Sequence, residues 1–146
     1  MMTKLFLAAL SLLLAAPLAA PASAPATCAD PCPIIARSEG YVLPAATIAS
    51  GARIAFSSAD IGHVTSEGTG IGGEPGCFGI RTTPGTDAPL VTLRIEGASV
   101  VASYTDSGGR DHEAPCASAQ ALPAGGFVVP FYCTIHSNMR GSVVVS

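Results

Sequence analysis

Three residues near the end of the chain are of types that bind metal ions. Cys133, His136 and Met139 follow one another at intervals of three residues, between two strand-like runs. One tight loop could therefore offer a thiolate, an imidazole and a thioether to a single ion. Two imidazoles and a thiolate in one plane, with a long, weak bond to a thioether, form the ligand set of copper sites that transfer electrons. The spacing predicts a copper site that is completed by one further imidazole.

The chain contains only three histidines, so the candidates for that imidazole are few. His63 follows an alternating run, Arg53–Ser57, and a short polar turn that contains Asp60. His112 lies instead in the charged, glycine-rich segment Ser107–Glu113, which predicts an exposed turn. We therefore expect His63, and not His112, to complete the site.

The segment Phe131–Val145 and the surroundings of His63 together resemble the cupredoxin family, small blue copper proteins such as plastocyanin, amicyanin and pseudoazurin. The two residues between successive ligands in the C-terminal loop are most similar to the loop of amicyanin. The resemblance covers residues 41–146. One departure is Val64, because many family members have Asn or Thr directly after this histidine, where the side chain braces the ligand loop.

The resemblance implies one copper ion that alternates between Cu(I) and Cu(II), held by His63, Cys133, His136 and Met139. Cys133 would supply a short Cu–S bond and intense visible absorption, and Met139 a long axial contact that helps to set the potential. His63 would be buried, whereas His136 would present its ring edge near solvent as the electron port. A protein of this kind is a monomeric one-electron carrier that catalyses no reaction of its own. It docks transiently with donor and acceptor redox proteins near His136.

Other interpretations of these residues stay open at this point. A Cys-x-x-His pattern with a nearby methionine can be a buried thiol beside a surface histidine. Met139 argues against this, because the other two methionines, Met1 and Met2, lie in the N-terminal leader, and a single methionine is not ordinary core filler. The same fold could also hold Cu(I) for storage or delivery, or could be a structural domain that has lost its metal.

The N-terminus predicts export to the periplasm or the medium. Lys4 precedes an apolar run, Leu5–Ala16, and small residues follow as far as Ala26, which is the pattern of a secretory signal peptide. The run is shorter than the about 20 apolar residues that cross a bilayer, so we expect no stable membrane insertion. Cleavage after Ala24 or Ala26 fits the preference for small residues. The predicted organisation is a signal peptide at 1–26, a cysteine-containing segment at 27–40 and a copper-binding domain at 41–146.

The chain has five cysteines, so in an exported protein at least one thiol must stay outside a disulfide within the chain. A copper-binding Cys133 would be that thiol. Cys77 with Cys116 would then close a loop of about 40 residues and stabilise the fold by ~3–4 kcal/mol. Cys28 with Cys32 is the remaining pair, although crossed pairings stay open. The string Cys-x-x-x-Cys-Pro at this second pair resembles the copper-binding loop of thioredoxin-fold copper chaperones, but no strand–helix–strand pattern follows it, so we interpret it as a disulfide.

Glycine and proline, 16 and 12 residues, recur between short β-branched runs, and long helical periodicity is missing. This pattern predicts an all-β fold, a Greek-key β-sandwich or barrel. Pro130 cannot donate to a ladder, so its strand is expected to lie at an edge or to bulge there. Thr65–Gly76 is expected to be a glycine-rich loop over or beside the metal site. The expected strands are Tyr41–Leu43, Ala46–Ala49, Arg53–Ser57, Cys77–Thr82, Leu90–Glu96, Ser99–Tyr104, Gly126–Cys133 and Gly141–Val145.

The charge of the exported part limits its partners. Of seven basic residues only Lys4 lies in the leader, which leaves six arginines against ten acidic residues, a formal charge of about −4. This balance disfavours nucleic-acid binding. It suits weak, fast docking to a basic patch on a redox protein, or simply keeps the protein soluble. Asp111 and Glu113 lie in the predicted turn, and no set of residues suggests hydrolysis.

Overall fold

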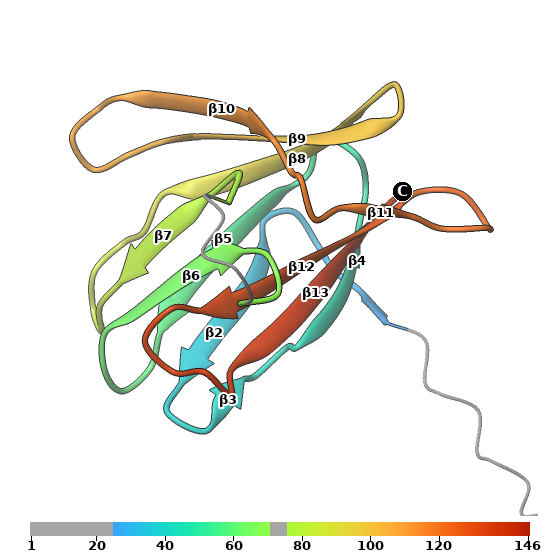
Figure 1. Ribbon diagram of the computed structural model, residues 1–146. Coiled ribbons are helices and arrows are strands. Elements are labelled where there is room, and N and C mark those ends of the chain that lie inside the picture. Colours follow the sequence, from blue (N-terminus) through green and yellow to red (C-terminus); the bar gives the residue numbers. More distant parts are fainter. Residues whose placement is uncertain (1–24, 71–75) are drawn as a thin grey trace, which may run out of the picture.

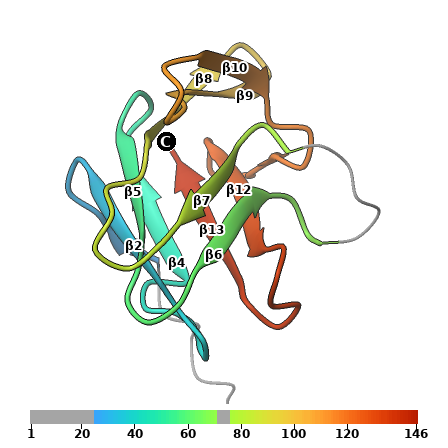
Figure 2. The same ribbon diagram turned by 90° about the vertical axis from the view of Figure 1, so that its left-hand side faces the viewer.

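The computed structural model describes residues 25–70 and 76–146, and these residues form strands and no helix. Figures 1 and 2 show two sheets packed face to face. The predicted all-β class is therefore confirmed. The strands are β1 (Ala26–Thr27), β2 (Cys32–Arg37), β3 (Gly40–Tyr41), β4 (Ala45–Ile48), β5 (Arg53–Ser58), β6 (His63–Glu67), β7 (Gly79–Thr82), β8 (Leu90–Glu96), β9 (Ser99–Thr105), β10 (Asp111–Pro115), β11 (Gln120–Ala121), β12 (Phe127–Cys133) and β13 (Arg140–Val145).

One sheet has the order β1-β4-β13-β12-β6-β7, with β11 paired to β12, and the other has the order β10-β9-β8-β5-β2-β3. The chain changes sheet between β1 and β2, β3 and β4, β4 and β5, β5 and β6, β7 and β8, and β10 and β11. Such crossings are the connections expected of a Greek-key sandwich. They bring β6 next to β12, so that His63 and Cys133, which are 70 positions apart in the chain, lie at the same end of two neighbouring strands.

The core lies between the sheets and is built by alternation along each strand. On β12, Val129, Phe131 and Cys133 are buried, and on β8 the same holds for Val91 and Leu93. Period-2 alternation of this kind places one face of a strand on the core. Phe131 lies at the centre, with its ring perpendicular to that of Tyr41 at 4.9 Å and to that of Phe56 at 5.7 Å between centroids. The end of β12 is thus fixed by close aromatic packing.

Gly141→Ala is expected to destabilise the protein by ~1–3 kcal/mol, because it overpacks this core. Gly141 pairs with Phe131 across β12 and β13. A Cβ at this position would meet the Phe131 ring and lie 2.8 Å from the carbonyl oxygen of Pro44. Urea unfolding measures the effect. Gly79→Ala is the control, since a Cβ there has no heavy atom within 4 Å, and an equal loss in both variants would contradict the packing explanation.

Strand β2 was not among the expected strands, because residues 27–40 were predicted as a cysteine-containing segment ahead of the domain. In the structure β2 pairs in parallel with β5, and Ile34 and Ala36 are buried. β3 pairs only with Ala36 and Arg37 of β2, so the part around Pro33 has a neighbour on one side only. A proline is tolerated in such a place because no ladder bond on the open side depends on it.

Pro130 was expected at an edge or a bulge, but β12 has neighbours on both sides. Its pairing with β6 begins only at Phe131, and its pairing with β11 reaches only Val128. Pro130 therefore lies in the gap between two partners on that side, where its carbonyl oxygen accepts a hydrogen bond of 2.9 Å from the Gly68 amide. The prediction that β12 is an edge strand was therefore wrong. Pro130, which has no amide hydrogen to donate, lies where the hydrogen-bond ladder on that side of β12 is interrupted.

The loop predicted from Thr65 onward was wrong at its beginning, because Thr65, Ser66 and Glu67 belong to β6. The glycines further along the segment suggested a loop, yet these three residues are buried and their polar groups have partners. The Thr65 hydroxyl lies 3.0 Å from that of Tyr41, and a Glu67 carboxylate oxygen accepts a bond of 2.8 Å from the Ser118 amide. A polar strand can be buried when each polar group has such a partner.

Two disulfides are present among the described residues, and both are the predicted pairs. Cys28–Cys32 joins the segment after β1 to the start of β2, and Cys77–Cys116 joins the residues before β7 to those after β10. Cys133 is the free cysteine and is buried.

The predicted signal peptide falls mainly on residues 1–24, which lie outside the described residues, as do 71–75 of the predicted loop. Within the ranges 25–70 and 76–146, no helix has the length and apolar character needed to span a bilayer.

Candidate metal centre

The pairing of β6 with β12 brings His63 to Cys133. Cys133 at the end of β12 pairs with Thr65, two residues after His63 at the start of β6. Residues directly opposite in an antiparallel pair project to the same face, and so do residues two apart on one strand. His63 and Cys133 therefore both face the core at the same end of the sandwich, and their side chains are 0% and 1% exposed.

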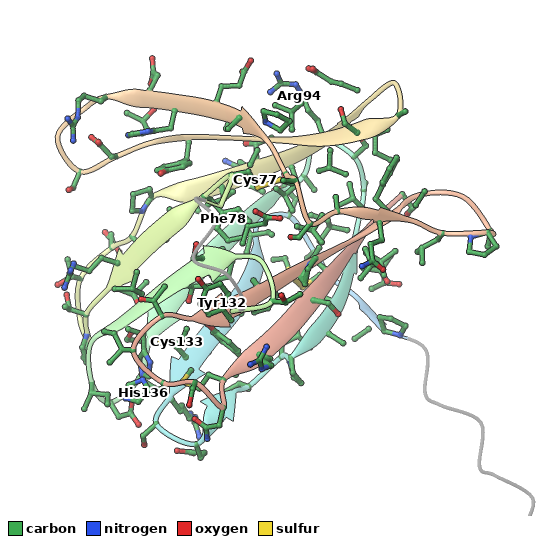
Figure 3. All side chains as sticks on the ribbon, viewed as in Figure 1. Cys77, Phe78, Arg94, Tyr132, Cys133 and His136 are labelled. Carbon is green, nitrogen blue, oxygen red and sulfur yellow. A yellow bond between two sulfur atoms is a disulfide. The ribbon has the colours of Figure 1, made fainter. Side chains whose placement is uncertain are left out.

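The loop after β12 turns back on itself and carries His136 to the same place. The Cys133 amide donates to the Met139 carbonyl oxygen at 3.1 Å, and the Met139 amide donates to the His136 carbonyl oxygen at 3.0 Å. The Thr134 amide donates to the carbonyl oxygen of Val64 at 2.9 Å. Val64, which has no polar side chain to brace the loop, thus holds the start of the loop through its main chain. In Figure 3, Cys133 and His136 lie at the end of the sandwich where β12 leads into this loop, away from Cys77.

The donor atoms of three side chains converge. The Cys133 Sγ lies 3.7 Å from Nδ1 of His63 and 3.5 Å from Nδ1 of His136, and all three donors lie within 4.8 Å of one another. The two imidazole rings are tilted by 51° with centroids 4.9 Å apart. His136 is half-buried, whereas the other two are buried. The three donors thus face a common point that is closed on the His63 side and reaches the surface at His136.

These distances fit a single metal ion. Bonds of about 2.0 Å to nitrogen and about 2.3 Å to sulfur, at an angle of about 120°, put the nitrogen and the sulfur about 3.7 Å apart. The observed separations of 3.5 and 3.7 Å agree with this spacing. Two imidazoles and one thiolate also make a donor set that suits copper. The residues present therefore fit a bound ion.

Met139, the fourth predicted ligand, is fully buried at the end of the loop. Its amide and carbonyl groups close the turn that contains His136, so its backbone position is fixed relative to the other candidates. The apolar surroundings of Phe131 and the burial of Cys133 keep water from this side of the site.

Asp60 is a further residue of the site. Its Oδ1 lies 3.3 Å from Nε2 of His63, and its Oδ2 accepts bonds of 2.8 Å from the Ser38 amide and from the Ser38 hydroxyl. Oδ1 also accepts a bond of 2.8 Å from the Ile61 amide. These bonds, those from Ser38 first, hold the pKa of Asp60 well below its usual value, so the side chain is a carboxylate at neutral pH. The sequence analysis noted this aspartate only as part of a turn.

Tyr41, on β3, is buried in the core on the face of β6 and β12 that also carries Cys133. Its hydroxyl lies 3.0 Å from that of Thr65, the residue opposite Cys133. Burial raises the pKa of Tyr41 well above its usual value, so the phenol keeps its proton. The side chain therefore adds a neutral polar group to an otherwise apolar wall.

His112 lies outside this cluster, in β10, which was predicted as part of an exposed turn. Its Nε2 lies 2.8 Å from Oδ2 of Asp106, and its ring stacks on that of Tyr104 with 4.7 Å between centroids. The bond from His112 is the largest cause of the lowered pKa of Asp106. The turn prediction holds for residues 107–109 but was wrong from Asp111 onward, because β10 pairs with β9 along its whole length.

No protein-family model and no curated protein matches the chain. Similar solved structures include amicyanin from Paracoccus versutus, 20% identical, covering 86% of each chain, with a TM-score of 0.48. Plastocyanin from Dryopteris crassirhizoma is 16% identical, with 78% of this chain and 99% of that chain covered and a TM-score of 0.36. A copper-containing nitrite reductase from Thermus scotoductus SA-01 is 14% identical, with 91% of this chain and 25% of that chain covered and a TM-score of 0.37. The sequence identities and TM-scores of these structures are low. The function of this chain is therefore inferred from its own residues.

Proposed function

We propose that this chain is an exported type 1 copper protein of the cupredoxin kind that carries single electrons between redox proteins. The observation that supports this most is the convergence of His63, Cys133 and His136, whose donor atoms lie within 4.8 Å of one another at one end of a β-sandwich. A thiolate next to two imidazoles in a mostly buried site is a donor set for copper and for electron transfer.

Bound copper would supply a centre that alternates between Cu(II) and Cu(I). The protein's part is to keep the ligands in place in both states, because a site that changes little in shape transfers electrons with a small reorganisation cost. Pairing of β6 with β12 holds His63 and Cys133, and the hydrogen bonds of the loop hold His136. Met139 would be the weak fourth ligand, buried at the end of that loop.

His136 would be the place where electrons enter and leave. It is the one of the three clustered side chains that is only half-buried. Two large apolar side chains next to cluster residues in sequence are exposed: Ile135, beside His136, is 56% exposed, and Ile61, two residues before His63, is 44% exposed. Exposed apolar side chains beside a half-buried ligand would suit a small, transient interface with a donor or an acceptor. The protein would act as a monomer and catalyse no reaction of its own.

Cyclic voltammetry of the copper-loaded mature protein tests the proposal. A reversible one-electron wave is expected, since the ligands are held by the fold in both oxidation states. Tight Cu(I) binding without reversible electron exchange would contradict electron transfer and favour storage or delivery. Absence of copper binding would favour a structural domain.

Met139→Leu is expected to keep the visible band and to raise the reduction potential. The two side chains have similar volumes, so the buried position tolerates the change. A weak axial sulfur stabilises Cu(II) more than Cu(I), and each tenfold loss of relative Cu(II) affinity raises the potential by about 59 mV. Voltammetry measures the shift. A potential equal to that of the unchanged protein would exclude Met139 as a ligand.

A further inference from the structure

The ring of His63 has two nitrogens, and each lies near a different group. Nδ1 lies 3.7 Å from Sγ of Cys133 and Nε2 lies 3.3 Å from Oδ1 of Asp60. His63 is 0% exposed and the side chain of Asp60 is 36% exposed. The imidazole thus spans the distance between the buried metal centre and a carboxylate at the surface of the same end of the sandwich.

The carboxylate is itself held in place. Ser38, in the turn between β2 and β3, donates to Oδ2 with both its amide and its hydroxyl, and the Ile61 amide donates to Oδ1. Three hydrogen-bond donors from two segments therefore fix the Asp60 carboxylate independently of its contact with His63. An exposed aspartate without such bonds would sample several rotamers and could not hold a ring in one orientation.

A carboxylate that accepts a hydrogen bond from a metal-binding histidine has two effects. It fixes the proton on the nitrogen that faces it, which leaves the other nitrogen free as a ligand, and it makes that nitrogen a stronger donor. A nitrogen ligand that is made more basic by a neighbouring carboxylate stabilises the more highly charged state of the ion. Supporting residues of this kind typically change metal affinity by about 10–100-fold.

We propose that Asp60 is a positioning residue that fixes the Nε2–H form of His63, with Nδ1 directed at the metal, and that lowers the reduction potential of the site by favouring Cu(II). The second half rests on the proposed copper-binding function. The first half concerns the chain's own residues and holds for the metal-free protein as well.

Nitrogen-15 NMR of the metal-free protein tests the first half. In the neutral ring of His63 the proton is expected on Nε2, with Nδ1 unprotonated. His112 is the internal comparison, because its Nε2 also faces an aspartate, Asp106, at 2.8 Å, far from the cluster. Protonation of Nδ1 in His63 with a bare Nε2 would overturn the proposal without any variant and without copper.

Asp60→Asn tests the second half. The amide keeps the size of the side chain and an oxygen acceptor but removes the charge. The Cu(I) affinity relative to the Cu(II) affinity is expected to rise about tenfold, which corresponds to a potential about 59 mV higher. Asp30→Asn is the matched control, since it removes the same charge from an exposed ion pair with Arg53.

A potential that changes equally in Asp60→Asn and Asp30→Asn would contradict the role of Asp60. If Asp60→Asn does not fold, Ser38→Ala serves instead. It removes one of the bonds to Oδ2 but leaves both ring and carboxylate in place, and a smaller rise in potential is expected from it. An unchanged potential in Ser38→Ala would then count against the proposal. A protein that binds no copper at all would contradict the proposed function, while the NMR result on His63 would still stand.

Discussion

Cys133→Ser is expected to abolish the intense visible absorption of the copper-loaded protein while the fold is retained. The band arises from the thiolate bond to copper, and a serine hydroxyl is a poor ligand for the same ion. Cys133 is the free cysteine of the chain and is 1% exposed, so its thiol is not needed for a disulfide. The loss of a direct ligand should exceed the about 10–100-fold loss of affinity that follows from removing a supporting residue.

Absorption spectra and circular dichroism of the variant measure both parts of this prediction. Thr134→Ala is the matched control, because it changes the exposed residue next to Cys133 and should leave the band intact. A band of normal intensity in Cys133→Ser would rule out the thiolate as a copper ligand. Loss of the β-sheet signal would mean that the serine variant has unfolded, and the band would then have to be compared in Cys133→Ala.

Cys77→Ala combined with Cys116→Ala is expected to lower the free energy of unfolding by ~4 kcal/mol, on the loop-entropy account of disulfide stabilisation. The bridge spans 39 residues, which include all of β7, β8, β9 and β10. Removing it releases a long loop in the unfolded chain. Because the bridge lies at the end of β6 away from His63, the visible band should persist in the folded fraction.

Cys28→Ala combined with Cys32→Ala is the comparison for that result. These two cysteines are only four residues apart, so the same account gives a loss of ~2 kcal/mol. Urea unfolding of the two double variants measures the difference. Equal losses, or a larger loss for the short loop, would show that something other than loop length determines the contribution of each bridge.

The C-terminal loop could be predicted because its chemistry is local. Cys133, His136 and Met139 are close in sequence, so their spacing alone indicates that one turn can present them together. The alternating strand Leu90–Glu96 was likewise predicted with its observed bounds, since one apolar face and one polar face are plain in its sequence.

The parts of the fold that were missed depend on contacts between distant segments. β6 reads as polar, and only the partners of Thr65 and Glu67 on other elements explain its burial. β2 contains Pro33, and only the short extent of β3 explains why a proline fits there. Sequence patterns report the preferences of one segment, whereas these strands are stabilised by groups that the folded chain supplies.

The role of Asp60 was missed for the same reason. A turn that contains an aspartate before His63 is visible in the sequence, but the bonds from Ser38 that hold the carboxylate come from 22 residues away. No local pattern indicates that these two turns meet. The histidine could therefore be predicted as a ligand, while the group that orients its ring could not.

The most direct test of the copper site is the visible absorption spectrum of the purified mature protein after addition of Cu(II), followed by ascorbate. An intense band near ~600 nm is expected, which bleaches on reduction and returns on reoxidation, because thiolate, imidazole and copper would then form a type 1 site. A protein that stays colourless with Cu(II) in excess would contradict the account, since the converging donors of His63, Cys133 and His136 would then not hold Cu(II) as proposed.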